Sequence, residues 1–207
     1  MEHMISTSSQ QVKDLYPWIF EDQPIALEGQ AVISMAELTT PLGPMLAGAT
    51  TEGICLLEFT DRIRIVKEFD DLKKSLNAVI LPGRNRHTDL LEEQLKEYFD
   101  GSRKAFTVPL HTPGNDFTNA VWATLREIPY GTTCSYKVQS EKMNNPKAIR
   151  AIAATNGRNR IAIIIPCHRV IGSNGSLTGY AGGIDKKKWL LILAETFRYS
   201  SRNVVLA

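Results

Sequence analysis

No stretch of this chain of 207 residues is both apolar and long enough to cross a membrane. A membrane-spanning helix needs roughly 20 consecutive apolar residues. The start, Met1 to Gln11, also lacks the charged region and apolar stretch of a signal peptide. These absences predict a cytoplasmic protein with no membrane partner, and its 43% hydrophobic content suffices for a globular core.

Cysteine is scarce. The three residues, Cys55, Cys134 and Cys167, form no C-x-x-C pair, which argues against a disulfide framework and against a structural zinc site. We therefore expect reduced thiols, as in the cytoplasm, and no bound metal.

The net charge of +2 does not by itself indicate a polyanionic partner. The distribution of charge is more informative. Between Lys137 and Arg169 there are seven lysines or arginines and one acid, Glu141, whereas acids gather at 68–71 and 89–100. The second half of the chain is therefore the half that could face phosphate.

The first half has the pattern of a small α/β module. Residues 1–30 show no clear period apart from a short helix expected around 12–20, and we assign this leader no function. Strands are expected at 31–38, 44–50 and 54–59, separated by turn sequences rich in Pro and Gly. Amphipathic helices are expected at 61–76 and 87–100. These elements predict a domain over 31–112 built on an antiparallel meander.

The second domain, 113–207, begins within the breaker-rich linker 111–114. Asp116 is a suitable cap for its first helix, and Ser135 for a short helix that ends near residue 143. Asn144 suits a left-handed turn position, and Asn145 with Pro146 can begin another helix. Two helices joined so tightly predict a helix-turn-helix.

The expected helix over 146–156 has two different faces. Ile149, Ile152 and Ala153 lie on one face, and the other face combines small residues with two cations: Lys147, Arg150, Ala151 and Ala154. This composition allows close approach to a phosphate backbone, but an ordinary amphipathic surface helix fits the spacing equally well.

The apolar run 161–165 leads directly into Pro166-Cys167-His168. A thiolate is the nucleophilic form of cysteine, and a neighbouring base or cation favours it. A Cys-His dipeptide alone is most often structural, and Cys55 and Cys134 have no such neighbour and are interpreted as structural.

The surroundings of Cys167 are more specific than the dipeptide. They resemble the O6-alkylguanine-DNA alkyltransferase family from about residue 41 to 195, most strongly over 117–191. The matching positions are the segment 166–170 with Tyr136, Arg150, Asn159, Gly175, Gly179, Tyr180, Gly182 and Gly183.

The resemblance implies the chemistry of the site. Cys167 is similar to the acceptor thiol, and His168 to the base that deprotonates it through an ordered water. Asn159 would brace the active-site turn. Tyr180 would supply a proton to the departing guanine, and Val170, Tyr180, Ala181 and Asn156 would line the base pocket.

The resemblance also implies the partner, double-stranded DNA that carries O6-alkylguanine. Tyr136 would help to expel the nucleotide, and Arg150 would occupy the vacated space. The recognition helix, with Lys147, Ala151 and Ala154, would lie in the minor groove.

The implied fold is α/β: a small N-terminal module with an antiparallel sheet, followed by a mainly helical, winged helix-turn-helix-like domain. The implied activity is irreversible transfer of the alkyl group from DNA to Cys167, once per molecule. We expect a monomer that needs no cofactor.

One position departs from the family pattern. The family usually has a glutamate five residues after the tryptophan of its last helix, here Trp189, where it supports the histidine. That position is Ala194, and Glu195 follows it. Either the helix is shifted so that Glu195 supports His168, or the thiol is less activated than usual, because one residue turns a helix by about 100°.

Two other classes of protein are considered. A sensor that binds alkylated DNA without repairing it would have no acceptor cysteine, and this chain has Cys167. A cysteine hydrolase would need an oxyanion hole rather than a helix-turn-helix.

Overall fold

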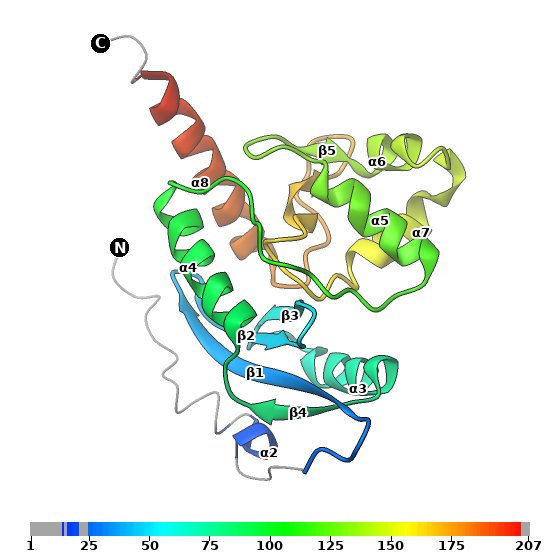
Figure 1. The fold of residues 1–207 in the computed structure, drawn as a ribbon. Helices are drawn as coiled ribbons and strands as arrows, with labels where there is room; N and C mark the ends of the chain where they lie inside the picture. Colours follow the sequence, from blue (N-terminus) through cyan, green and yellow to red (C-terminus); the bar gives the residue numbers. More distant parts are fainter. Residues whose placement is uncertain (1–13, 15, 21–24, 204–207) are drawn as a thin grey trace. The chain divides into compact units, whose positions relative to one another are not determined.

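The computed structural model describes residues 14, 16–20 and 25–203 (Figure 1). A short helix is expected around 12–20, and the structure describes α2 (Pro17–Phe20) within that range. Most of the residues before it lie outside the described part.

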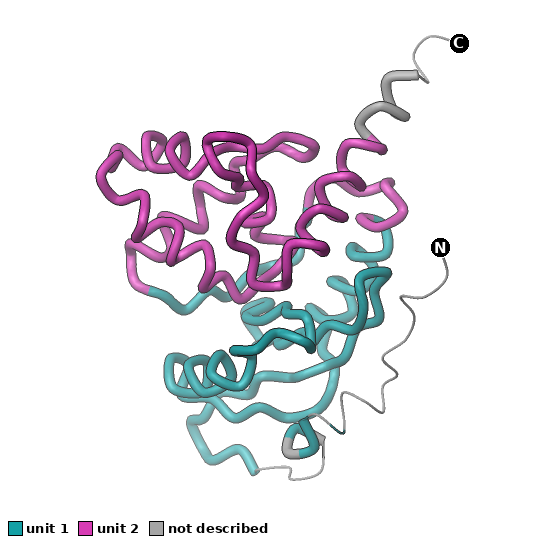
Figure 2. The backbone as a smooth tube through the Cα atoms, turned by 180° about the vertical axis from the view of Figure 1, so that it is seen from behind, with its two compact units in different colours: residues 1–97, 106–114 teal, residues 98–105, 115–207 magenta. Residues whose placement is uncertain are grey.

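The described residues divide into two compact units (Figure 2). Unit 1 comprises those up to residue 97 together with 106–114, and unit 2 comprises 98–105 and those from 115 onward. The last of the three crossings between the units, after residue 114, thus follows the breaker-rich segment 111–114.

The sheet of unit 1 contains the predicted meander. Strands β1 (Ala31–Thr40), β2 (Gly43–Ala49) and β3 (Ile54–Phe59) pair antiparallel in sequence order. A fourth strand, β4 (Ala78–Pro82), lies parallel to β1 and gives the order β3-β2-β1-β4. The predicted antiparallel meander is therefore confirmed, but β4 was not predicted, and its parallel pairing makes the sheet mixed rather than wholly antiparallel. Five residues directly after a helix are too few to show a strand period.

Unit 1 also contains helix α3 (Ile65–Leu76) and the part of helix α4 (Arg86–Asp100) up to residue 97. Helix α3 begins later than the predicted start at residue 61, because the preceding segment forms a turn around the buried Arg62. The Arg62 guanidinium pairs with the buried carboxylates of Glu58 and Glu68. Helix α4 agrees with its prediction to one residue and ends before Gly101, whose φ is +85°.

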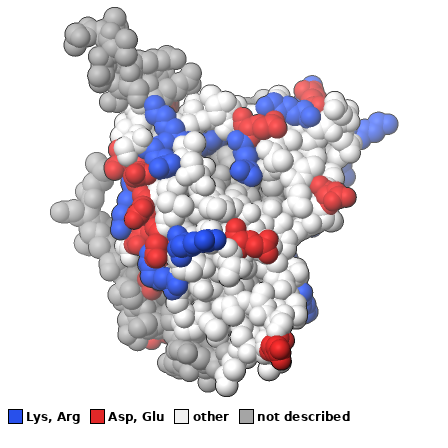
Figure 3. Space-filling model, in the orientation of Figure 1, with Lys and Arg blue, Asp and Glu red and all other residues white. Residues whose placement is uncertain are grey.

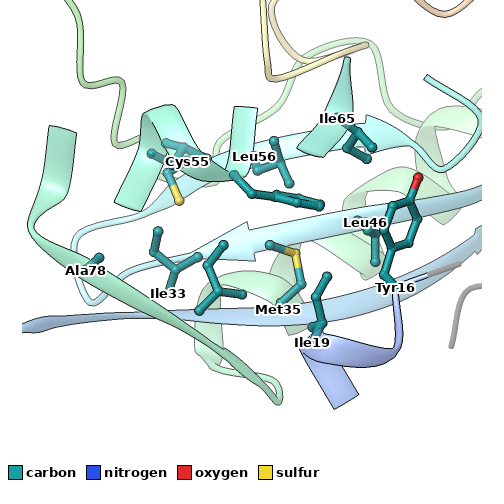
Figure 4. Packing of buried hydrophobic residues seen from close by; sticks show 12 residues of the cluster. Tyr16, Ile19, Ile33, Met35, Leu46, Cys55, Leu56, Ile65 and Ala78 are labelled. Atoms are coloured by element: carbon teal, nitrogen blue, oxygen red, sulfur yellow. The ribbon is translucent and has the colours of Figure 1, made fainter. Parts of the chain in front are cut away.

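The apolar core of unit 1 lies between the sheet and its helices. Figure 4 shows side chains from β1, β2 and β3 gathered with Ile19 of α2 and Ile65 of α3. Cys55 belongs to this cluster, is fully buried and donates its S–H to the carbonyl of Gly48 at 3.4 Å. These contacts are those of a small core residue, as expected for Cys55.

Unit 2 begins its regular structure with helix α5 (Asp116–Arg126). The N-cap is Asn115, whose side chain accepts a hydrogen bond from the N–H of Thr118 at 2.9 Å. The prediction of Asp116 as the cap is therefore wrong by one residue. Asn and Asp cap helices equally well, so sequence preference could not separate these neighbours.

The helix-turn-helix is present. Helix α6 (Tyr136–Lys142) is capped by Ser135, which accepts a hydrogen bond from the N–H of Val138 at 3.1 Å. Asn144 adopts the predicted left-handed conformation, with a φ of 52°. The second helix differs in detail: a 3₁₀ turn, η1 (Pro146–Ala148), precedes α7 (Ile149–Asn156), and Asn145 makes no side-chain capping bond.

The remaining elements carry Cys167. The 3₁₀ turn η2 (Cys167–Arg169) is followed by β6 (Val170–Ile171), which pairs parallel with β5 (Cys134–Ser135) directly before α6. The last helix is α8 (Ile184–Asn203). The α/β class is thus confirmed, and no described helix combines the length and the apolar character that a membrane span requires.

Candidate active site around Cys167

The segment before Cys167 is buried but is not a strand. Residues 161–165 form a turn, and every side chain in it is at most 9% exposed. Ile163 has a φ of +69°, a conformation that β-branched residues rarely adopt. Surrounding packing must hold such a residue in place, and strained positions of this kind are frequent at functional sites.

Asn159 makes four hydrogen bonds, three of them to the backbone of this turn. Its Oδ1 accepts from the N–H of Ile161 at 3.0 Å, and its Nδ2 donates to the carbonyls of Ile161 and Ile165 at 3.4 and 2.8 Å. The same Nδ2 donates to Sγ of Cys167 at 3.2 Å. The amide thus joins the backbone of the turn to the sulfur, and donation to a sulfur favours its thiolate form.

His168 is completely buried, and neither ring nitrogen has a hydrogen-bond partner within the described residues. Its ring lies edge-on to that of Tyr180, with centroids 6.3 Å apart. Burial first, and then the charges of Arg169 and Lys187, hold the pKa of His168 well below its usual value of 6.5. The imidazole is therefore neutral at neutral pH and able to accept a proton.

Lys187 is a site residue that the sequence analysis did not identify. It is buried, and its Nζ donates to the carbonyls of Val170 and Thr178, both at 2.6 Å. Burial lowers its pKa, while the nearby Cys167 acts in the opposite direction. A cation close to a thiol stabilises the thiolate.

The sequence carried a signal for Lys187. It shares a helical face with the buried Leu190 and Ala194, three and seven residues further along α8. However, residues 186–188 are all lysine, so the sequence of this run does not distinguish Lys187 from its more accessible neighbours.

Tyr136, the first residue of α6, contacts the same carbonyl of Thr178 as Lys187 does. Its hydroxyl donates to the carbonyl of Thr178 at 3.5 Å, and a Cβ at Gly179 would lie 3.1 Å from this hydroxyl. The pKa of Tyr136 is raised, chiefly by burial and then by Cys167. The structure therefore places Tyr136 within electrostatic range of Cys167, in addition to the DNA-facing position predicted for it.

The residues predicted for the base pocket have different surroundings. Val170 is fully buried in β6, Tyr180 is partly exposed beside His168, and Ala181 is exposed. Asn156 is buried, donates to Oε1 of Gln139 at 2.7 Å and accepts from Nε2 of Gln139 at 3.3 Å. These paired amide hydrogen bonds link α7 to α6, so Asn156 has a structural role. Its place in the base pocket stays a prediction.

The recognition-helix segment presents the expected face to solvent. Lys147, Arg150, Ala151 and Ala154 are exposed, whereas Ile152 is fully buried. Ile149, predicted for the apolar face, is 36% exposed. The face of the molecule drawn in Figure 3 intersperses cations with acids and is not uniformly basic.

A cavity of about 380 Å³ borders His168. Its lining consists of Gly131, Thr132, Thr133, His168, Arg169, Leu191, Ala194 and Glu195. Ala194 is 3% exposed, whereas the side chain of Glu195 is exposed. Since the ring nitrogens of His168 have no partner in the described part of the chain, Glu195 does not hydrogen bond to it in this structure.

Among the described residues, no three side chains of His, Cys, Asp or Glu are grouped as metal ligands. The groups around Cys167 are instead the amide donor of Asn159, the cation of Lys187 and the neutral imidazole of His168. This arrangement suits a thiol that must lose its proton and attack a carbon atom.

Comparison with known proteins gives consistent matches. A family model described as "6-O-methylguanine DNA methyltransferase, DNA binding domain" matches residues 116–195. A methylated-DNA–protein-cysteine methyltransferase of Methanosarcina barkeri is 41% identical over 161 residues, covering 76% of this chain and 94% of the relative. The constitutive one of Bacillus subtilis is 44% identical over 166 residues, covering 79% and 95%. The crystal structure of Mycobacterium tuberculosis OGT in complex with DNA matches with a TM-score of 0.68 and 34% identity, covering 80% of this chain and 94% of the other.

Proposed function

This chain belongs to the family of methylated-DNA–protein-cysteine methyltransferases, and from that premise we propose that it repairs DNA by transferring an alkyl group from O6-alkylguanine to Cys167. One observation carries the assignment to Cys167. Its Sγ accepts a hydrogen bond from the turn-fixing Asn159 at 3.2 Å, next to the buried and neutral His168. Cys55 instead donates its S–H to the carbonyl of Gly48, and burial raises the pKa of Cys134.

The transfer begins with the proton of Cys167. His168 accepts this proton through a bridging water, and the resulting thiolate is stabilised by Lys187 and by the N–H of Asn159. Sγ then attacks the alkyl carbon, the carbon–O6 bond breaks, and its electron pair remains on the guanine.

Guanine leaves as a neutral base because it receives a proton. Tyr180 donates this proton, and His168 returns the proton of the thiol to Tyr180, so the net change is thiol plus alkylguanine to thioether plus guanine. The thioether is not cleaved again, and no cofactor is needed. Each molecule therefore acts once.

The reaction requires an extruded nucleotide, because an alkyl group within the base stack is out of reach of the thiol. We propose that the helix-turn-helix lies in the minor groove, where the exposed Ala151 and Ala154 allow close approach and Lys147 faces phosphate. Arg150 fills the space that the guanine leaves, and Tyr136 acts on the phosphate of the expelled nucleotide. The protein performs this as a monomer.

Transfer is tested with duplex DNA that carries one O6-methylguanine with a labelled methyl group. Stoichiometric transfer of the label to the protein, and its loss in Cys167→Ser, are the expected results. Tight binding of this duplex without transfer would instead indicate a sensor, and neither binding nor transfer would contradict both functions. The Cys55→Ser variant serves as the matched control and should keep the transfer.

A further inference from the structure

The cavity beside His168 is not explained by the transfer reaction. It lies in unit 2, and its lining includes His168, whose ring is completely buried and has no hydrogen-bond partner in the described residues. Ala194, with its single methyl group, leaves this space open from α8. A buried imidazole that borders an open space needs a polar partner there, because burial of an unsatisfied polar group is costly.

The charges around the cavity favour an anion. Arg169 lines it, is 7% exposed, and its buried Nε has no hydrogen-bond partner in the described part of the chain. The charges of Arg169 and Lys187 both act on His168. The one acidic side chain in the lining, Glu195, is exposed and makes no bond to the imidazole.

We propose that this cavity binds a small carboxylate anion, of the size of formate or acetate, which pairs with His168 and the guanidinium of Arg169. The proposal rests on the function proposed for Cys167. The anion accepts a hydrogen bond from the ring of His168 and stabilises the imidazolium that forms when Cys167 loses its proton. It takes part in no bond formation and is bound reversibly.

The free anion is favoured over the chain's own carboxylate for a geometric reason. Residues 194 and 195 are about 100° apart around α8. The buried position, which is held on the same helical face as Lys187 and Leu190, belongs to Ala194. Glu195 also lines the cavity, but it is exposed and lies off the buried face of α8.

The proposal is tested by measuring alkyl transfer from the free base O6-benzylguanine while sodium formate replaces sodium chloride at constant ionic strength. The free base avoids the salt dependence of DNA binding. We expect a saturable rise in the single-turnover rate of about tenfold, which corresponds to a one-unit rise in the pKa of the imidazole. No rise would overturn the anion site, whereas absence of transfer to Cys167 under every condition would contradict the proposed function instead.

Two variants of Ala194 make the test specific. Ala194→Ser leaves the cavity open and should keep the response to formate. Ala194→Gln fills the cavity with an uncharged side chain and should remove the response. An equal response in Ala194→Gln would place the formate effect elsewhere and refute the proposal.

A measurement of binding avoids dependence on the rate. Formate should raise the thermal unfolding midpoint, relative to chloride, in the unmodified protein and in Ala194→Ser but not in Ala194→Gln. The Glu195→Gln variant separates the two sources of carboxylate. A formate response that appeared in Glu195→Gln alone would show that Glu195 occupies the site, and would overturn the free-anion proposal.

Discussion

Replacing Ala194 by glutamate should accelerate alkyl transfer to Cys167. Ala194 is buried and lines the cavity beside His168, and this cavity of about 380 Å³ has room for the longer side chain. The new carboxylate would face an imidazole that has no hydrogen-bond partner in the described part of the chain. It would therefore stabilise the imidazolium that forms when Cys167 is deprotonated.

The magnitude follows from the charge that is added. A carboxylate about 4 Å from the imidazolium contributes roughly 4 kcal/mol at an effective dielectric constant near ~20. Desolvation of the glutamate removes part of this energy. An opposite charge at such distances shifts a pKa by about 1–3 units. A shift of about one unit corresponds to about 1.4 kcal/mol, and it makes the ion pair of Cys167 thiolate and His168 imidazolium about tenfold more populated. We therefore expect the single-turnover rate at neutral pH to rise about tenfold.

Rapid-quench measurement of methyl transfer from one alkylated duplex checks this expectation. Ala194→Gln is the matched control, because it has nearly the size of the glutamate without its charge. The reasoning would be refuted if the Glu and Gln variants reacted equally fast. A large loss of rate in Glu195→Ala would also refute it, since Glu195 would then already support His168.

Three further predictions concern the same unit. Mass spectrometry after reaction should find one added alkyl group, on Cys167, and an adduct on Cys55 or Cys134 would contradict the assignment. Arg150→Ala should slow repair of duplex DNA much more than reaction with free O6-benzylguanine, since only the duplex requires extrusion, and equal losses would remove the proposed role. Folding lowers the pKa of His168, so His168 of the unfolded state binds its proton at a higher pH than His168 of the folded state. The free energy of unfolding should therefore fall as the pH decreases from about 6.5 toward the lowered pKa, by up to about 1.4 kcal/mol per pH unit. Urea denaturation at several pH values should show this slope in the unmodified protein, and an unchanged slope in His168→Gln would assign it to another group.

Much of the secondary structure could be predicted because its signals are local. The side chain of Ser135 caps α6, Asn144 turns the chain between the two helices, and Gly101 ends α4, each through its own backbone preference. Strand β4 could not be predicted in this way. Its five residues become a strand only because β1 offers a free edge for parallel pairing.

The site shows the same contrast. The motif around Cys167 and the residues Asn159 and Tyr136 could be identified from sequence, through resemblance to a family. Lys187 was not identified, because residues 186–188 are all lysine and its helical spacing from Leu190 and Ala194 was the one local signal. Only the contact of Nζ with the carbonyls of Val170 and Thr178 separates Lys187 from its neighbours.

The sequence by itself determined the chemical groups: one thiol beside one imidazole, an arginine among small residues in a helix-turn-helix, and an alanine where a glutamate is usual. Tertiary structure decided what surrounds these groups. It buried His168 without a hydrogen-bond partner in the described part of the chain, brought the cations of Arg169 and Lys187 near it, and opened a cavity at Ala194. The reason is physical: the pKa of a group depends on burial and on charges that approach through space. The identity and spacing of residues along the chain do not specify those distances.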